Sequence, residues 1–150
     1  MRSTETFTVV NTDEHTGKCS LAAHGKPIKN ALVGAVIDGQ YECAQSRYLL
    51  CLSFGTVWDD ALNIYLVDAD GAVLDAITGG GLMSSGAFKA RDCNDNALDF
   101  TFFSDETISR VTVSPTPAVH FLLPAPWRYR NLLPMHHLSL TDVAPGVARV

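Results

Sequence analysis

The candidates for proton transfer in this sequence are His120, His136 and Asp59. A histidine titrates near neutral pH, and a carboxylate can accept a proton or orient an imidazole. His136 is followed directly by His137, and adjacent side chains on a strand point to opposite faces. We therefore expect only one of this pair to face an interior site.

The histidines and cysteines lack the spacings that are typical of metal sites. The sequence contains no His-x-His followed by a carboxylate, no His-Glu-x-x-His and no Cys-x-x-Cys. A metal site would have to be assembled entirely by tertiary contacts. The sequence therefore predicts no metal and no other cofactor.

The cysteines offer one further candidate for catalysis. Cys93 follows Arg91 in a polar stretch, where a nearby cation could activate a thiol, whereas Cys51 lies in an apolar run typical of a core. The sequence has neither a Gly-x-Ser-x-Gly nor a Ser-x-x-Lys motif, so no serine nucleophile is indicated. Without an export signal, we expect all four cysteines to be reduced thiols.

A proline-bounded segment, residues 124–135, combines the side chains that contribute most to protein interfaces. Tryptophan, tyrosine and arginine give large contact areas and directional hydrogen bonds. The candidate binding residues are Trp127, Arg128, Tyr129, Arg130 and Met135. Two interpretations stay open: the segment docks on another surface, or Trp127 and Tyr129 plug one end of the core.

Glycine is concentrated in residues 79–86, which contain four glycines. No lysine follows in the arrangement of a phosphate-binding loop. The stretch is therefore expected to be a mobile connection, which is also compatible with a flap over a cavity.

These candidates must be positioned by strands, because alternation of apolar and polar residues with period two dominates the sequence. The clearest element is a hairpin over residues 62–78 around Asp70-Gly71, a pair that tolerates the positive φ of a tight turn. With a two-residue loop, Val67 faces Leu74 on one side, and Leu66 faces Asp75 on the other. Both faces are largely apolar, so the hairpin belongs in a sheet covered twice or in a sheet that meets another subunit.

Further strand patterns complete an all-β prediction. A second hairpin is expected from residues 97–103 and 107–113, and single strands at 6–10, 31–37, 48–54, 118–123 and 137–141. Residues 42–52 fit a helical turn or a strand, and residues 127–133 fit a short helix. The sequence predicts a sandwich or barrel of about nine mostly antiparallel strands, with one or two short helical turns.

Composition limits the possible partners and the size of the fold. The chain has 150 residues, which fits a single domain over residues 1–150, and 47% of them are hydrophobic. Its net charge of −5 disfavours nucleic acid as a partner. No signal peptide or membrane-spanning stretch is present, so we expect a cytoplasmic protein.

Two classes of function remain. The first is a non-catalytic binding or assembly module that forms a homodimer, suggested by the two-faced hairpin and by residues 124–135, with another protein or a small apolar ligand as further partners. The second is a small enzyme with a histidine and carboxylate site in a β cavity beneath residues 79–86.

Overall fold

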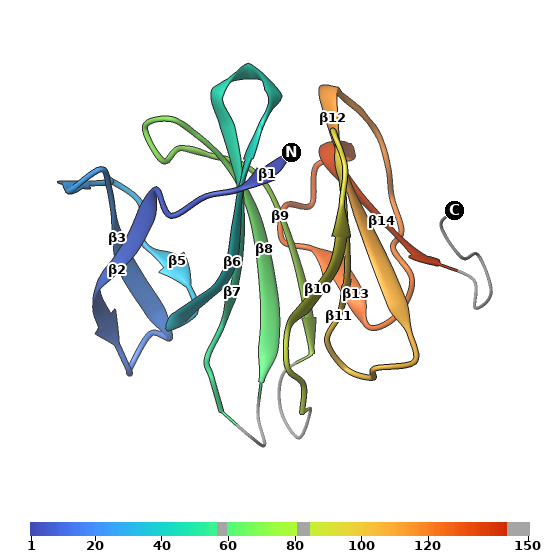
Figure 1. Cartoon of the computed structure of the whole chain (residues 1–150), viewed down its shortest axis with the longest axis horizontal. Helices are drawn as coiled ribbons and strands as arrows, with labels where there is room; N and C mark the ends of the chain where they lie inside the picture. The colour runs from blue at the N-terminus through green and yellow to red at the C-terminus, as the bar shows by residue number, and fades with distance from the viewer. Residues whose placement is uncertain (57–59, 81–84, 144–150) are drawn as a thin grey trace.

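The fold consists almost entirely of antiparallel strands in three sheets (Figure 1). The computed structural model describes residues 1–56, 60–80 and 85–143, which contain fourteen strands and one three-residue 3-10 turn, η1 (Ala44–Ser46). The strands are β1 (Arg2–Ser3), β2 (Phe7–Asp13), β3 (Lys18–Ala23), β4 (Lys26–Pro27), β5 (Leu32–Val33), β6 (Val36–Cys43), β7 (Arg47–Ser53), β8 (Ala61–Asp68), β9 (Val73–Gly80), β10 (Lys89–Cys93), β11 (Ala97–Thr101), β12 (Ile108–Val119), β13 (Trp127–Tyr129) and β14 (Met135–Val143). The all-β prediction is confirmed, but the expected number of about nine strands is too low.

Six strands form the central sheet, in the order β1-β6-β7-β8-β9-β13. Strands β6 to β9 follow one another in the chain and pair antiparallel, as short connections between consecutive strands allow. Strand β13 comes from much later in the chain and pairs with β9, with Trp127 opposite Gly79. One edge of the central sheet is therefore formed by β13, a segment from the C-terminal part of the chain.

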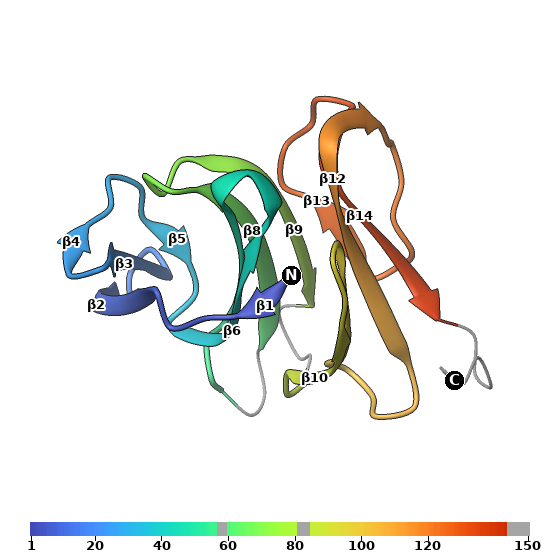
Figure 2. The ribbon, with the colours of Figure 1, turned by 45° about the horizontal axis from the view of Figure 1, so that its top comes forward.

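The central sheet lies between two smaller sheets (Figures 1 and 2). The N-terminal sheet has the order β2-β3-β4, with β5 also paired to β3, and the C-terminal sheet has the order β10-β11-β12-β14. The described ranges hold no helix of the length and apolar character needed to cross a membrane.

Each face of the central sheet contributes to a separate hydrophobic core. Alternation along β8 sends Ile64 and Leu66 into the C-terminal core, against Leu98, Phe100, Val111, Leu138 and Leu140 of the C-terminal sheet. The same alternation sends Tyr65 and Val67 into the N-terminal core, against Phe7, Cys19, Leu21 and Leu32. Both apolar faces of the predicted hairpin are thus covered by the chain itself.

The hairpin has the predicted register except at its turn. Leu66 pairs with Asp75 as expected, but a bulge follows and Val67 pairs with Val73 rather than Leu74. The prediction of a two-residue loop is therefore wrong. The reason is that the Oδ1 atom of Asp68 accepts hydrogen bonds from the backbone N–H groups of Asp70 and Ala72, both at 2.9 Å, which stabilises a longer turn.

Three other predicted elements need correction. The expected helix at residues 127–133 is wrong, because the backbone of Trp127 to Tyr129 pairs with the edge of β9 as β13. The expected strand at residues 31–37 is interrupted at Gly34, whose φ of +139° breaks the extended run between β5 and β6. The strand expected at residues 118–123 ends at Val119, where pairing with Met135 at the start of β14 stops.

Candidate functional site

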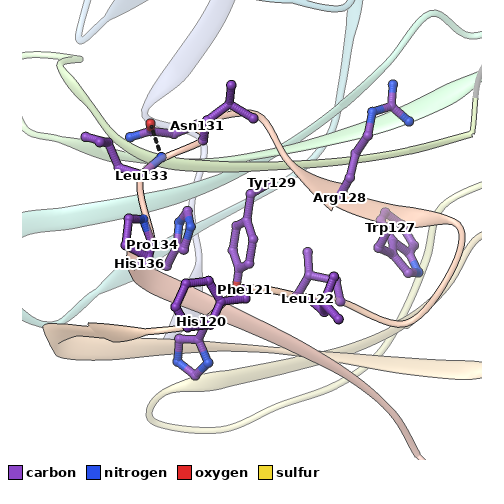
Figure 3. A pocket seen from close by; sticks show the side chains of 12 residues that line it. His120, Phe121, Leu122, Trp127, Arg128, Tyr129, Asn131, Leu133, Pro134 and His136 are labelled. Atoms are coloured by element: carbon purple, nitrogen blue, oxygen red, sulfur yellow. Dashed lines mark hydrogen bonds between the residues drawn. The ribbon is translucent and has the colours of Figure 1, made fainter.

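An apolar pocket lies beside β13, between the connection that follows β12 and the start of β14 (Figure 3). Its volume is about 310 Å³. Aromatic and aliphatic side chains predominate among its lining residues: His120, Phe121, Leu122, Leu123, Trp127, Arg128, Tyr129, Asn131, Leu132, Leu133, Pro134 and His136. An apolar pocket with a few polar groups is the usual form of a binding site.

A buried pair of titratable side chains, His136 and Asp75, stands at this pocket. His136 near the start of β14 places its Nδ1 atom 2.9 Å from Oδ1 of Asp75 on β9, and both side chains are 2% exposed. Asp75 also accepts hydrogen bonds from the backbone N–H groups of Ala76 at Oδ1 and Leu138 at Oδ2, each at 2.9 Å. The carboxylate is held by three donors from two sheets.

This arrangement fixes which nitrogen of His136 carries the proton. A carboxylate oxygen without a proton only accepts hydrogen bonds, so Nδ1 is the donor to Asp75, and in the neutral imidazole that carries this proton Nε2 has the lone pair. Nε2 makes no hydrogen bond within the part of the chain that the structure describes. Because His136 lines the pocket, this nitrogen can accept a hydrogen bond or a proton from a bound molecule.

Tyr129 holds the imidazole of His136 in place from one side. The two rings are stacked, with centroids 3.5 Å apart and planes at 9°, and the Tyr129 hydroxyl donates to the carbonyl of Leu138 at 2.7 Å. Burial, followed by the nearby charge of Asp75, raises the pKa of Tyr129 to about 12. The phenol therefore keeps its proton at neutral pH and remains a donor.

Large exposed apolar side chains either line this pocket or, as Val119 and Met135 do, adjoin lining residues in the chain. We call this group the apolar rim. It holds six of the ten exposed large hydrophobic residues of the described chain: Val119, Phe121, Leu122, Leu132, Leu133 and Met135. Leu132 is 98% exposed and Leu122 is 91% exposed. Such clustering is typical of a surface that binds a partner or a ligand.

The predicted binding residues occupy different environments. Trp127 is buried, and its ring lies flat against Gly79 and edge-on to Phe100, so it plugs the core while also lining the pocket. Met135 is part of the apolar rim. Arg128 lines the pocket, but its guanidinium points away from the other lining side chains (Figure 3).

Arg130 has a supporting role at the edge of the central sheet. Its Nη2 atom donates to Oδ1 of Asn63 at 2.6 Å, and its guanidinium lies 5.9 Å from the centroid of the Tyr65 ring. Oδ1 of Asn63, a fully buried side chain, also accepts from the Thr78 hydroxyl. Arg130 thus ties the end of β13 to β8.

The candidate catalytic residues are not all brought together. His120 and His136 line the same pocket. Cys93 ends β10, and its Sγ atom donates to the carbonyl of Met1 at 3.0 Å, away from this pocket. Asp59 lies outside the described residues. Of the glycine-rich stretch, Gly79 and Gly80 belong to β9, while residues 81–84 also lie outside the description.

Sequence reasoning missed Asp75, the partner of His136. The signal was present: an acidic residue occupies an inward position of an otherwise apolar strand face, opposite Leu66. A buried carboxylate requires a partner, but the pattern does not identify it. No cluster of three or more potential metal ligands occurs in the ranges that the structure covers.

Comparisons with protein-family models, curated proteins and solved structures find no match. Function is therefore argued from the pocket itself. The arrangement offers a hollow, an apolar rim and, at Nε2 of His136, a hydrogen-bond acceptor that is supported by a buried carboxylate.

Proposed function

We propose that this protein is a binding module that self-associates as a homodimer through its apolar rim. The observation that carries the proposal is the concentration of exposed large apolar side chains around one pocket. Removing apolar surface from water stabilises association by roughly 25 cal/mol per Å² before the costs of ordering are subtracted. The rim is therefore the surface of the described chain that gains most from a partner.

A second copy fits this surface because the patch is self-complementary. A twofold pair places the same patch on both subunits, so each patch must supply both a projection and a hollow. Leu132 and Leu122 project into solvent beside a hollow of about 310 Å³, which exceeds the volume of a leucine side chain. Each copy can insert a leucine into the pocket of the other.

Charge does not oppose this pairing. With its histidines neutral, the pocket lining includes one formal charge, on Arg128, and that guanidinium points away from the pocket (Figure 3). Two copies can therefore meet without burying like charges. The hairpin at residues 62–78 no longer supports dimerisation, because both of its faces pack into cores of the same chain and the exposed Val73 and Leu74 lie beside its turn.

The test is the mass of the protein in solution at micromolar concentration, measured by light scattering. We expect twice the chain mass of 16.2 kDa. Leu132→Glu should weaken association at least tenfold, about 1.4 kcal/mol, because a carboxylate would enter an apolar contact.

Leu74→Glu is the matched control, since Leu74 is also an exposed leucine but lies outside the apolar pocket. It should leave the mass unchanged. Circular dichroism of both variants should match the wild type, because both positions are solvent-exposed. A monomeric wild-type protein, or equal effects of the two substitutions, would contradict the proposal.

A second candidate function is general-base catalysis at His136, which the hydrogen bond from Nδ1 to Asp75 favours. In ester hydrolysis, Nε2 would take a proton from water as the water oxygen attacks the carbonyl carbon. The leaving alkoxide would then receive that proton. Asp75 would stabilise the intervening imidazolium, as a carboxylate does in hydrolytic triads.

Activated esters with apolar acyl groups are the appropriate substrates for this test. His136→Gln should lower any hydrolysis rate by about 100-fold or more, and His15→Gln, at an exposed histidine outside the pocket, is the control and should leave the rate unchanged. Equal rates for the wild type and His136→Gln would eliminate this candidate and leave the dimer proposal unaffected.

A further inference from the structure

Arg47, the first residue of β7, is a buried cation that the apolar pocket does not use. Arg47 is 6% exposed. Nε donates to the carbonyl of Ala44 at 3.1 Å, and Nη1 donates to the carbonyl of Ser114 at 2.8 Å. Nη1 also lies 3.4 Å from Nδ1 of His137, a distance that makes at most a weak hydrogen bond.

No carboxylate forms an ion pair with this guanidinium among the described residues, although Asp68 is opposite Arg47 in the register of β7 and β8. The ion pairs there involve other side chains, and the hydrogen-bond partners of Arg47 are two carbonyl oxygens and an imidazole. A buried charge is costly unless it is paired. Nη2 in particular makes no hydrogen bond within the described chain, which leaves two N–H donors unused.

Arg47 lines a second pocket, of about 450 Å³, whose lining residues Cys43 and Val113 also belong to the C-terminal core. Arg47 lines it together with Asn96, whose side-chain amide can donate, and with Val113 and Pro115, which are apolar. Burial raises the pKa of the Cys43 thiol at the same pocket, so this sulfur is neutral. The pocket thus combines one buried cation with an apolar wall.

One acidic residue, Asp95, also lines this pocket without forming an ion pair with Arg47 in the described structure. A negative charge entering the pocket is repelled by Asp95 and attracted by two cations, Arg47 and the N-terminal ammonium of Met1, which donates to the Asp95 carbonyl at 2.9 Å. This balance admits a monoanion more readily than a dianion. A carboxylate also matches the flat guanidinium edge, to which it can bond with both oxygens.

We propose that the pocket at Arg47 binds a small carboxylate that carries a short apolar chain. The carboxylate bonds to Nη2 of Arg47 and to the amide of Asn96, and its chain packs against Val113 and Pro115. The proposal is independent of the apolar rim and of His136, which line a different pocket.

The experiment is a titration of the isotope-labelled protein with sodium butyrate, followed by NMR at the Nε–Hε signal of Arg47. Sodium chloride keeps the ionic strength constant. We expect a saturable shift of that signal at millimolar butyrate, and weaker binding of inorganic phosphate because of its higher charge. Absence of a saturable shift, or tighter binding of phosphate, would overturn the proposal.

Two surface substitutions make the test independent of folding. Asp95→Asn removes the opposing charge and should tighten butyrate binding about two- to fivefold, whereas Asn96→Asp should weaken it by a similar factor. Both residues are exposed, and Asn96 uses its backbone in its hydrogen bonds, since its N–H donates to Oδ1 of Asn94 and its carbonyl accepts from the N–H of Val113. Glu14→Gln, at another pocket, is the charge-matched control and should change nothing. Identical affinities for the wild type and both pocket variants would refute the assignment.

Discussion

Among single residues, His136 and Asp75 form the buried pair that joins two sheets, with His136 on β14 and Asp75 on β9. The residue types were foreseeable, because the sequence singled out His136. The pairing was not foreseeable, because 61 positions separate the two residues and only the packing of β14 against β9 brings them together. Titratable groups can be found from sequence, whereas their distances depend on the tertiary fold.

Replacing the carboxylate should destabilise the protein strongly. Asp75→Asn puts an N–H₂ group where a buried acceptor faces three donors, so at least one hydrogen bond is lost. We expect a loss of about 3 kcal/mol in the free energy of unfolding, measured with urea. Asp70→Asn, on the exposed turn, is the control and should cost far less. A cost below about 1 kcal/mol for Asp75→Asn would argue against a stabilising pair.

Stability should fall at alkaline pH because of the buried phenols. The pKa values of Tyr129 and Tyr41 are raised to about 12, mainly by burial, above the ordinary value near 10. The folded state then holds protons that the unfolded state has lost, so this contribution is complete below pH 10 and disappears as the pH rises towards 12. Urea midpoints measured across this range should decline, and less steeply in Tyr129→Phe. Equal declines of the urea midpoint in the wild type and in Tyr129→Phe would contradict the raised pKa of Tyr129.

At the scale of elements, the central hairpin shows what periodicity can and cannot supply. Its strands, faces and most of its register follow from alternation, whereas the bulge depends on hydrogen bonds from Asp68 that alternation does not encode. The helix predicted at residues 127–133 is wrong because the conformation of β13 is set by pairing with the edge of β9, which lies far away in the sequence. Tertiary pairing overrides local propensity there.

The attachment of β13 to β9 depends on a glycine. A Cβ atom at Gly79 would lie 2.5 Å from Cε3 of Trp127, which is too close for real atoms. Gly79→Ala should therefore cost about 1–3 kcal/mol by overpacking, measured by urea unfolding.

A double-mutant cycle identifies the cause of that cost. In a Trp127→Leu background the same glycine substitution should cost less than about 1 kcal/mol, because the clashing ring is gone. An unchanged cost would mean that backbone conformation at Gly79, rather than the tryptophan, limits the site.

At the scale of the whole molecule, the three sheets are joined through shared cores. Composition and patterning predicted the all-β class, but they could not order three sheets, because sheet order depends on which faces meet in space. Leu49 and Leu50 show the difficulty: they are neighbours in β7, yet they belong to opposite cores.

Because one sheet serves both cores, we expect the protein to unfold in a single cooperative step. Leu50→Ala in the N-terminal core and Leu98→Ala in the C-terminal core, both fully buried, should each cost about 2–5 kcal/mol. Each should shift the whole urea transition, followed by circular dichroism. Two transitions, only one of which moves with each substitution, would instead reveal two independent domains.

The layered arrangement also matters while the chain is being synthesised. Everything on one side of the central sheet is translated by the time β9 ends at Gly80, whereas Leu98, Val111 and Leu138, which shield the other side, come later. A chain that ends near that point leaves the apolar face of the central sheet that the C-terminal sheet would cover exposed to water. Truncations there should aggregate or recruit chaperones, even though every residue they retain is native.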